Sequence, residues 1–162
     1  MLSGLSAVLA TSLCVVAPAP AGASGCFSIH RVEKSFANKM NRTRRAIGLR
    51  SMRLDPQLTY VARRHTRKMI RHHRLFHTTQ SQFDRWVTRW NYIGENVGYG
   101  GRVSTVYTAF LNSPDHYANI IGRHYSHVGV GVVRKGSRLW VTIQFEGWRN
   151  PGTRLDMPPV CR

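Results

Sequence analysis

Glu95 is one of only seven acidic residues in a chain of 162 that also carries 24 Lys and Arg, and it lies in the glycine-rich stretch NYIGENVGYG. Such an acid is either an ordinary turn residue or the acidic member of a site whose other members lie elsewhere. The chain has eight histidines, so some will lie near one another by composition alone. His73 and His77 stand four residues apart, a spacing that binds metal on helices but more often has no function. Glu95 therefore needs partners from other parts of the chain before it can be assigned chemistry.

The motifs of common hydrolase and nucleotide sites are missing from the sequence. It contains no HExxH and no G-x-S-x-G, and no phosphate-loop lysine follows the glycines around Glu95. The formal charge of +17 attracts nucleic acid, anionic lipid or acidic cell-wall polymers. The sequence does not favour nucleic acid as a partner, because neither a zinc-finger spacing nor an RNP-like aromatic motif is present.

The N-terminus has the pattern of a secretory signal. Residues 2–17 are apolar and uncharged, and PAPAGAS follows them with small residues that suit cleavage near Ala23. The run is short for a membrane span, and Pro18 and Pro20 end it. A buried N-terminal helix is the alternative, but the run has no polar stripe that would give it an outer face. We predict that residues 1–23 are a signal peptide and that residues 26–162 form one domain.

The cysteines agree with export. Cleavage near Ala23 would remove Cys14 and leave Cys26 and Cys161 near the two ends of the chain. In an oxidising compartment such a pair would close a disulfide. The alternative is lipidation of Cys26, because ASGC resembles the end of a lipoprotein signal, but lipidation would leave Cys161 unpaired. The sequence favours the disulfide.

Two helices are predicted in the first half of the chain. Apolar residues recur at helical spacing between residues 27 and 46. Asp55 as N-cap and Pro56 at the first helical position mark a second helix that runs towards Leu75. His65 lies on its apolar side and is expected to be a hydrogen-bonded core residue. The opposite face is basic; such arginines are usually solvated surface, but the charge of the chain makes four of them candidates for anion binding: Arg63, Arg64, Arg67 and Arg71.

The second half predicts two short helices and then a hairpin. Ser104 is placed to cap a helix over residues 106–111, and Ser113 to cap another that has Pro114 at its first position. Residues 128–145 alternate at period two on either side of a turn at Gly136, which predicts a β-hairpin. Helices followed by a hairpin predict an α+β domain in which helices cover a sheet.

Six pieces of the sequence occur in an order that is typical of a known family. They are FANKMNRTRRAIGLRSMRLDPQLTYVARRHTRKM, FHT, GENVGYG, FLNSPDHYANI, HYSHVGVGVV and LWVTIQF, and they cover nearly all of the chain after the predicted signal. In this order they resemble the CAP superfamily of cysteine-rich secretory, antigen 5 and pathogenesis-related-1 proteins, most closely its short secreted bacterial branch. The resemblance implies an α-β-α sandwich with a central antiparallel sheet and a shallow surface cleft.

The resemblance also implies a set of cleft residues. In CAP domains two histidines and two acids line the cleft; here they correspond to His77 and His124 and, for the first acid, Glu95. The second acid position falls at Ser113 or the proline after it, so the set is incomplete, and His116 is a replacement polar group one helical turn away. Two imidazoles and a carboxylate suit Zn²⁺ or a similar divalent ion, and the carboxylate could instead orient the imidazoles by hydrogen bonding.

Three functions are compatible with these features. The preferred one is a secreted, non-enzymatic and monomeric binding module for an anionic lipid, a sterol or a cell-envelope polymer, with the basic helix face steering the ligand to the cleft. The first alternative is a metal-dependent hydrolase that uses Glu95 as base and a metal held by His77 and His124 to activate water. The second alternative is a basic protein that disrupts the envelope, for which the charge is the whole argument.

Overall fold

The computed structural model describes residues 25–161, so the predicted signal segment and Cys14 lie outside the described residues. A four-stranded sheet forms the middle of three layers, and its strands are arranged in the order β1-β4-β5-β3: β1 (Arg53–Leu54), β4 (His127–Lys135), β5 (Arg138–Gly147) and β3 (Tyr92–Gly100). All neighbouring strands are antiparallel except β1 and β4, which are parallel. The predicted α+β class with a central, mostly antiparallel sheet is confirmed.

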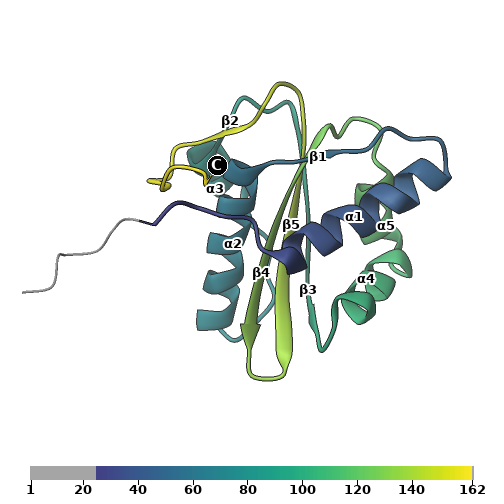
Figure 1. The fold of residues 1–162 in the computed structure, drawn as a ribbon, viewed down its shortest axis with the longest axis horizontal. Helices are drawn as coiled ribbons and strands as arrows, with labels where there is room; N and C mark the ends of the chain where they lie inside the picture. Colours follow the sequence, from purple (N-terminus) through teal and green to yellow (C-terminus); the bar gives the residue numbers. More distant parts are fainter. Residues whose placement is uncertain (1–24, 162) are drawn as a thin grey trace, which may run out of the picture.

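Helices cover both faces of this sheet (Figure 1). One face packs against α2 (Pro56–Arg71), and the other packs against three helices: α1 (Arg31–Ala46), α4 (Val103–Leu111) and α5 (Pro114–Ile121). The remaining elements are α3 (Gln80–Trp86) and a small two-stranded sheet of β2 (Val87–Thr88) and β6 (Gly152–Thr153). No helix within the described range is long and apolar enough to cross a membrane.

The predicted hairpin is confirmed, and its alternation explains how the layers pack. Val128, Val130 and Val132 point into the larger core, which α1, α4 and α5 complete. The intervening Gly129 and Gly131 face α2, and a Cβ at either position would meet the backbone of that helix. These glycines therefore allow α2 to lie directly against the sheet.

The ends of the predicted helices differ from the structure by a few residues. α2 begins as predicted, because the Asp55 carboxylate accepts a hydrogen bond from the backbone N–H of Leu58 at 2.8 Å. It ends at Arg71, before a left-handed residue at His73 (φ 54°), rather than near Leu75. α1 begins at Arg31 rather than Phe27, because residue 27 pairs with the C-terminal segment and His30 and Glu33 form a capping box.

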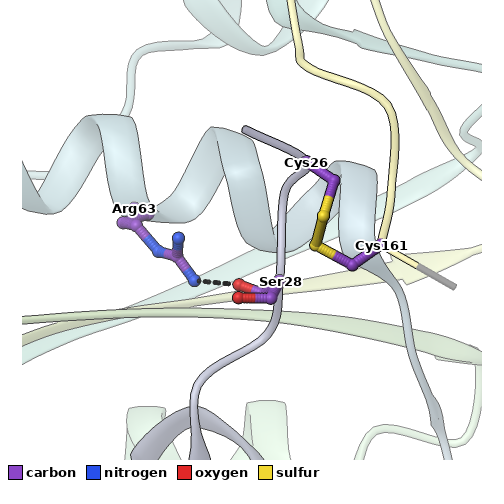
Figure 2. Close-up of a disulfide and its surroundings, with 4 residues drawn as sticks. All are labelled: Cys26, Ser28, Arg63 and Cys161. Atoms are coloured by element: carbon purple, nitrogen blue, oxygen red, sulfur yellow. Dashed lines mark hydrogen bonds between the residues drawn. A yellow bond between two sulfur atoms is a disulfide. The ribbon is translucent and has the colours of Figure 1, made fainter. Parts of the chain in front are cut away.

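The disulfide between Cys26 and Cys161 is confirmed, which leaves no place for the alternative lipidation of Cys26. Figure 2 shows it beside α2, where the Arg63 guanidinium donates a hydrogen bond to the carbonyl of Ser28 at 3.0 Å. Phe27, next to the disulfide, hydrogen-bonds Pro159 and Cys161 through its backbone. The two ends of the domain are thus joined to each other and to α2.

Candidate functional site

The site is built around Glu95, which lies in β3 and not in a turn. β3 pairs with β5 so that Glu95 stands opposite Gln144, and the two side chains share the face of the sheet that α2 covers. Asn96, the next residue, points to the other face, where its side chain donates to the carbonyl of His116 at 2.9 Å. The side chain of Glu95 is nearly buried, with the residue 8% exposed.

Four hydrogen bonds hold the Glu95 carboxylate. Oε1 accepts from His77 Nδ1 at 3.0 Å and from the backbone N–H of Thr78 at 2.8 Å. Oε2 accepts from the Thr78 hydroxyl at 2.6 Å and from the Gln144 amide at 3.2 Å. Burial by itself would raise the pKa of Glu95, but the hydrogen bonds from His77 and Thr78 and the nearby His65 outweigh it and lower this pKa. Glu95 is therefore an ionised carboxylate with its acceptor positions filled.

His77 is the exposed partner of this carboxylate. Its side chain is 60% exposed, and the hydrogen bond to Glu95 raises its pKa, with burial opposing. Since Nδ1 is taken by Glu95, Nε2 is the nitrogen left for a ligand. A carboxylate that holds one imidazole nitrogen and aims the other outward is the arrangement that orients histidine ligands in metal sites.

His116, the predicted replacement group, lies on α5, on the other side of β3 from the Glu95 carboxylate. Burial, and then the charge of His77, lower the pKa of His116. His116 Nδ1 is 2.9 Å from the Ser113 hydroxyl, and the ring packs against Phe110 with centroids 4.9 Å apart. Ser113 and His116, one helical turn apart, thus contact each other.

His124 lies elsewhere. Its ring stacks on Tyr92 at a centroid distance of 4.5 Å. Tyr92 precedes Glu95 by three strand residues, or about 10 Å along β3. Within residues 25–161, no group of three or more His, Cys, Asp or Glu side chains is placed to hold a metal ion. The predicted set of His77, Glu95 and His124 is thus not assembled in this structure, and of the two predicted imidazoles only His77 contacts Glu95.

Two hollows border His77 and His116. One, of about 240 Å³, is lined by basic and aromatic residues from the C-terminal part of α2 and the segment after it, namely Lys68, His72, Arg74, Phe76 and His77. The other, of about 270 Å³, is mostly apolar and lies between β3 and α4, with Val97, Tyr99, Val106, Phe110 and His116 among its walls. His77 therefore borders a basic pocket, and His116 borders a different, apolar one.

The sequence did not identify all residues of this site. His65 is the predicted buried histidine, since its Nε2 lies 2.8 Å from the Phe76 carbonyl, but it also lies 4.0 Å from Glu95. Thr78 and Gln144 were not predicted as partners of Glu95. The available signals were the position of Thr78 directly after His77 and the period-two alternation that puts Gln144 on the α2 face.

The basic face of α2 needs one correction. Arg63 is not available to an anion, because it is 6% exposed and forms a two-pronged ion pair with the fully buried Glu33 of α1. Its guanidinium also stacks on Phe27 at 4.5 Å. The helical pattern could not reveal this partner, which comes from another layer. Arg64, Arg67 and Arg71 remain exposed.

Comparisons with known proteins agree with this fold. The model of the cysteine-rich secretory protein (CAP) family matches residues 37–145. The uncharacterized protein YkwD of Bacillus subtilis (strain 168) is 32% identical over 127 residues, which cover 74% of this chain and 49% of the relative. The chain thus spans about half the length of this relative.

Two solved structures are similar in fold. An outer surface protein from Borrelia burgdorferi has a TM-score of 0.65 at 19% identity, over 72% of this chain and 92% of that chain. An extracellular protein containing an SCP domain from Bacillus anthracis has a TM-score of 0.64 at 21% identity, over 72% of this chain and 40% of that chain. At these identities the likeness concerns the fold alone.

Proposed function

Because the chain belongs to the cysteine-rich secretory protein family, and because its surface is almost free of carboxylates, we propose that it is a secreted binding module that holds an anionic polymer of the cell envelope. The observation that carries the proposal is that most of the acidic side chains are buried and therefore do not offset the positive charge of the surface. Four of the seven carboxylates are buried: Glu33, Asp55, Glu95 and Glu146. The exposed ones are Asp84, Asp115 and Asp156. The surface is therefore more one-sided in charge than the composition indicates.

The exposed arginines of α2 concentrate part of this positive charge along one side of the helix. Arg64, Arg67 and Arg71 are spaced three and four residues apart and so lie along one side of the helix. The basic hollow beside His77 lies at the end of the same helix, where Lys68 and Arg74 contribute to its wall. A polymer with repeated negative charges could follow this side of α2 and place one charged group at His77.

A hydrolytic function has less support. As a base, Glu95 would have to give up hydrogen bonds from His77, Thr78 or Gln144. The two imidazoles are also fewer than the three protein ligands of ordinary catalytic zinc sites. Metal-dependent hydrolysis by Glu95, His77 and His124 therefore remains the alternative proposal, without an assembled metal site among the described residues to favour it.

The binding proposal is tested by retention on purified cell wall. We expect the protein to bind wall that carries its anionic polymers and to be released as salt shortens the Debye length from about 10 Å at 0.1 M to about 3 Å at 1 M. Changing Arg64, Arg67 and Arg71 together to Gln should weaken retention more than changing Arg134, Lys135 and Arg138, which removes the same charge from the exposed β4–β5 turn region.

Each alternative outcome has a clear meaning. Retention that does not depend on salt, or that falls equally in both triple variants, would refute the proposed role of α2. Stronger binding to phosphatidylglycerol vesicles than to wall would move the ligand to anionic lipid, and dye leakage from those vesicles would support the envelope-disrupting alternative.

The metal alternative is tested by zinc titration calorimetry on the protein with its disulfide intact. If zinc binds with His77 and His116 as its ligands, His77→Ala and His116→Ala should abolish binding and His124→Ala should not. Loss of binding in His124→Ala would restore the set expected from the family resemblance.

A further inference from the structure

A hollow of the described chain lies away from Glu95, on the other side of the sheet from α2. It has a volume of about 460 Å³ and is formed by the segment that follows α1, residues 48–51, and the segment that follows α5, residues 123–126. Both segments belong to the layer opposite α2, at the end of the molecule where α1 ends (right side of Figure 1). No acidic residue lines this hollow.

Arg44 forms its floor. This residue is 2% exposed, and four of its N–H groups donate to carbonyl oxygens: those of Arg50, Ile120, Gly122 and Tyr125. The guanidinium thus fixes both segments that form the walls. No carboxylate of the described residues forms an ion pair with it, and its fifth N–H has no protein acceptor within residues 25–161. A buried cation without a counter-charge raises the affinity of the hollow for anions.

The rim adds exposed donors above this floor. Arg50 and Arg123 are exposed and come from opposite walls. The Ser51 hydroxyl accepts a hydrogen bond from Arg45 at 2.9 Å and keeps its own proton to donate, whereas the Ser126 hydroxyl lies 2.9 Å from His127 Nδ1. Guanidinium and hydroxyl groups together are the donors that proteins use to hold phosphate.

The rim also includes one of a pair of stacked aromatic rings, which a simple oxyanion would not require for binding. His124 lines the hollow and stacks on Tyr92, which is 51% exposed. The hollow is within the size range of small-molecule sites, so it is larger than a single oxyanion requires. The stacked rings give an adjacent surface against which a polyol or sugar could pack.

We infer that this hollow, with Arg44 as its floor and Arg50 and Arg123 at its rim, binds the phosphate ester of a polyol or sugar. The inference deepens the proposed function and rests on it for the source of the ligand, since phosphate esters of polyols and sugars are one class of anionic group that an envelope polymer could present. The site itself is separate from the basic side of α2, so each can be tested without the other.

The probe is glycerol 3-phosphate, titrated into isotopically labelled protein with its disulfide intact and followed by NMR. The backbone amides of residues 48–51 and 123–126 are expected to shift in a saturable way. The double variant Arg50→Gln/Arg123→Gln should bind at least tenfold more weakly. The control Arg134→Gln/Lys135→Gln, which removes the same charge at the exposed end of the hairpin, should bind as the wild type does.

Three outcomes decide whether the hollow is a specific phosphate site. Shifts confined to α2, or equal weakening in both double variants, would refute the site in favour of general charge. Equal or tighter binding of glucuronate would refute the phosphate assignment in favour of a carboxylate. Arg123→Lys keeps the charge but loses the planar guanidinium, and an affinity between those of the wild type and the double variant supports a direct contact.

The same titration distinguishes this inference from the proposed function. Glycerol 3-phosphate binding that survives the Arg64, Arg67 and Arg71 changes supports the site even if wall retention fails. Wall retention without any shift at residues 48–51 and 123–126 overturns the site and leaves the proposed function standing.

Discussion

Glu146 makes the stability of this protein depend on pH in a direction that can be measured. It lies on β5, is fully buried, and neither carboxyl oxygen accepts a hydrogen bond from the described residues, although His127 Nδ1 lies 3.0 Å from Oε2. Burial, together with the charge of Asp55, raises the pKa of this carboxyl from 4.5 to about 7. The folded protein therefore keeps a proton on Glu146 at pH values where the unfolded chain has lost it.

The sign of the effect follows from proton binding. A raised pKa in the folded state gives a contribution to stability that is complete below pH 4.5 and is lost as pH rises towards about 7. At about 1.4 kcal/mol per pH unit, the whole loss is about 3 kcal/mol. Glu146→Gln keeps the shape of the neutral carboxyl and cannot ionise. The variant should therefore become more stable relative to the wild type as pH rises from 4.5 to 7.

The assay is urea unfolding of both proteins, with the disulfide intact, at half-unit steps of pH. Other groups titrate in the same range, so the informative quantity is the difference in unfolding free energy between the two proteins. Asp156→Asn, at an exposed position, makes the same change in net charge and should give a difference that hardly changes with pH. A Glu146→Gln difference that stays flat between pH 4.5 and 7 would show that the carboxyl ionises freely in the folded protein.

Three further predictions concern the packing of the layers. Replacing Cys26 and Cys161 by Ser should lower the unfolding free energy by up to about 5 kcal/mol, the chain-entropy value for a loop of this length, as measured by urea unfolding under oxidising conditions. Glu33→Gln should lower it by about 3–5 kcal/mol, because it leaves the buried Arg63 without a counter-charge; an exposed Asp84→Asn change is the comparison. Gly131→Ala should cost about 3 kcal/mol or more in the same assay, because its Cβ would meet the backbone of α2, and a change below about 1 kcal/mol would contradict the close approach.

The parts of the fold that the sequence predicted are those set by local patterns. The cap and proline at Asp55 and Pro56 and the alternating valines around Gly136 act over a few residues, so their geometry follows from the chain itself. The disulfide was predicted from two cysteines near the ends of the chain that would remain after the predicted signal. The length of β3 did not follow, because its glycines suggest a turn. In the structure Gly98 instead leaves room for the ring of Phe110, which packs against the strand.

Only some of the contacts in the candidate site were predicted, because most of them join residues that are far apart in the sequence. The contact between His77 and Glu95 was expected from the family resemblance, and the structure contains it. The burial of Arg63 depends on Glu33, which comes from a helix thirty residues earlier and packs from the other layer, so no helical pattern could show it. The position of His124 depends on the short connection between α5 and β4, which turns the ring towards Tyr92 instead of Glu95.

Glu95 and Asn96 are consecutive residues of one edge strand, yet they form hydrogen bonds to elements on opposite sides of the sheet. Glu95 holds the segment that carries His77, and Asn96 holds the carbonyl of His116. The segments that carry the two histidines are therefore tied to two adjacent residues, although the histidines belong to different layers. If β3 shifted slightly along its axis, these hydrogen bonds would move the segments that carry both histidines with it. The strand is therefore a shared support for two groups that lie in different layers.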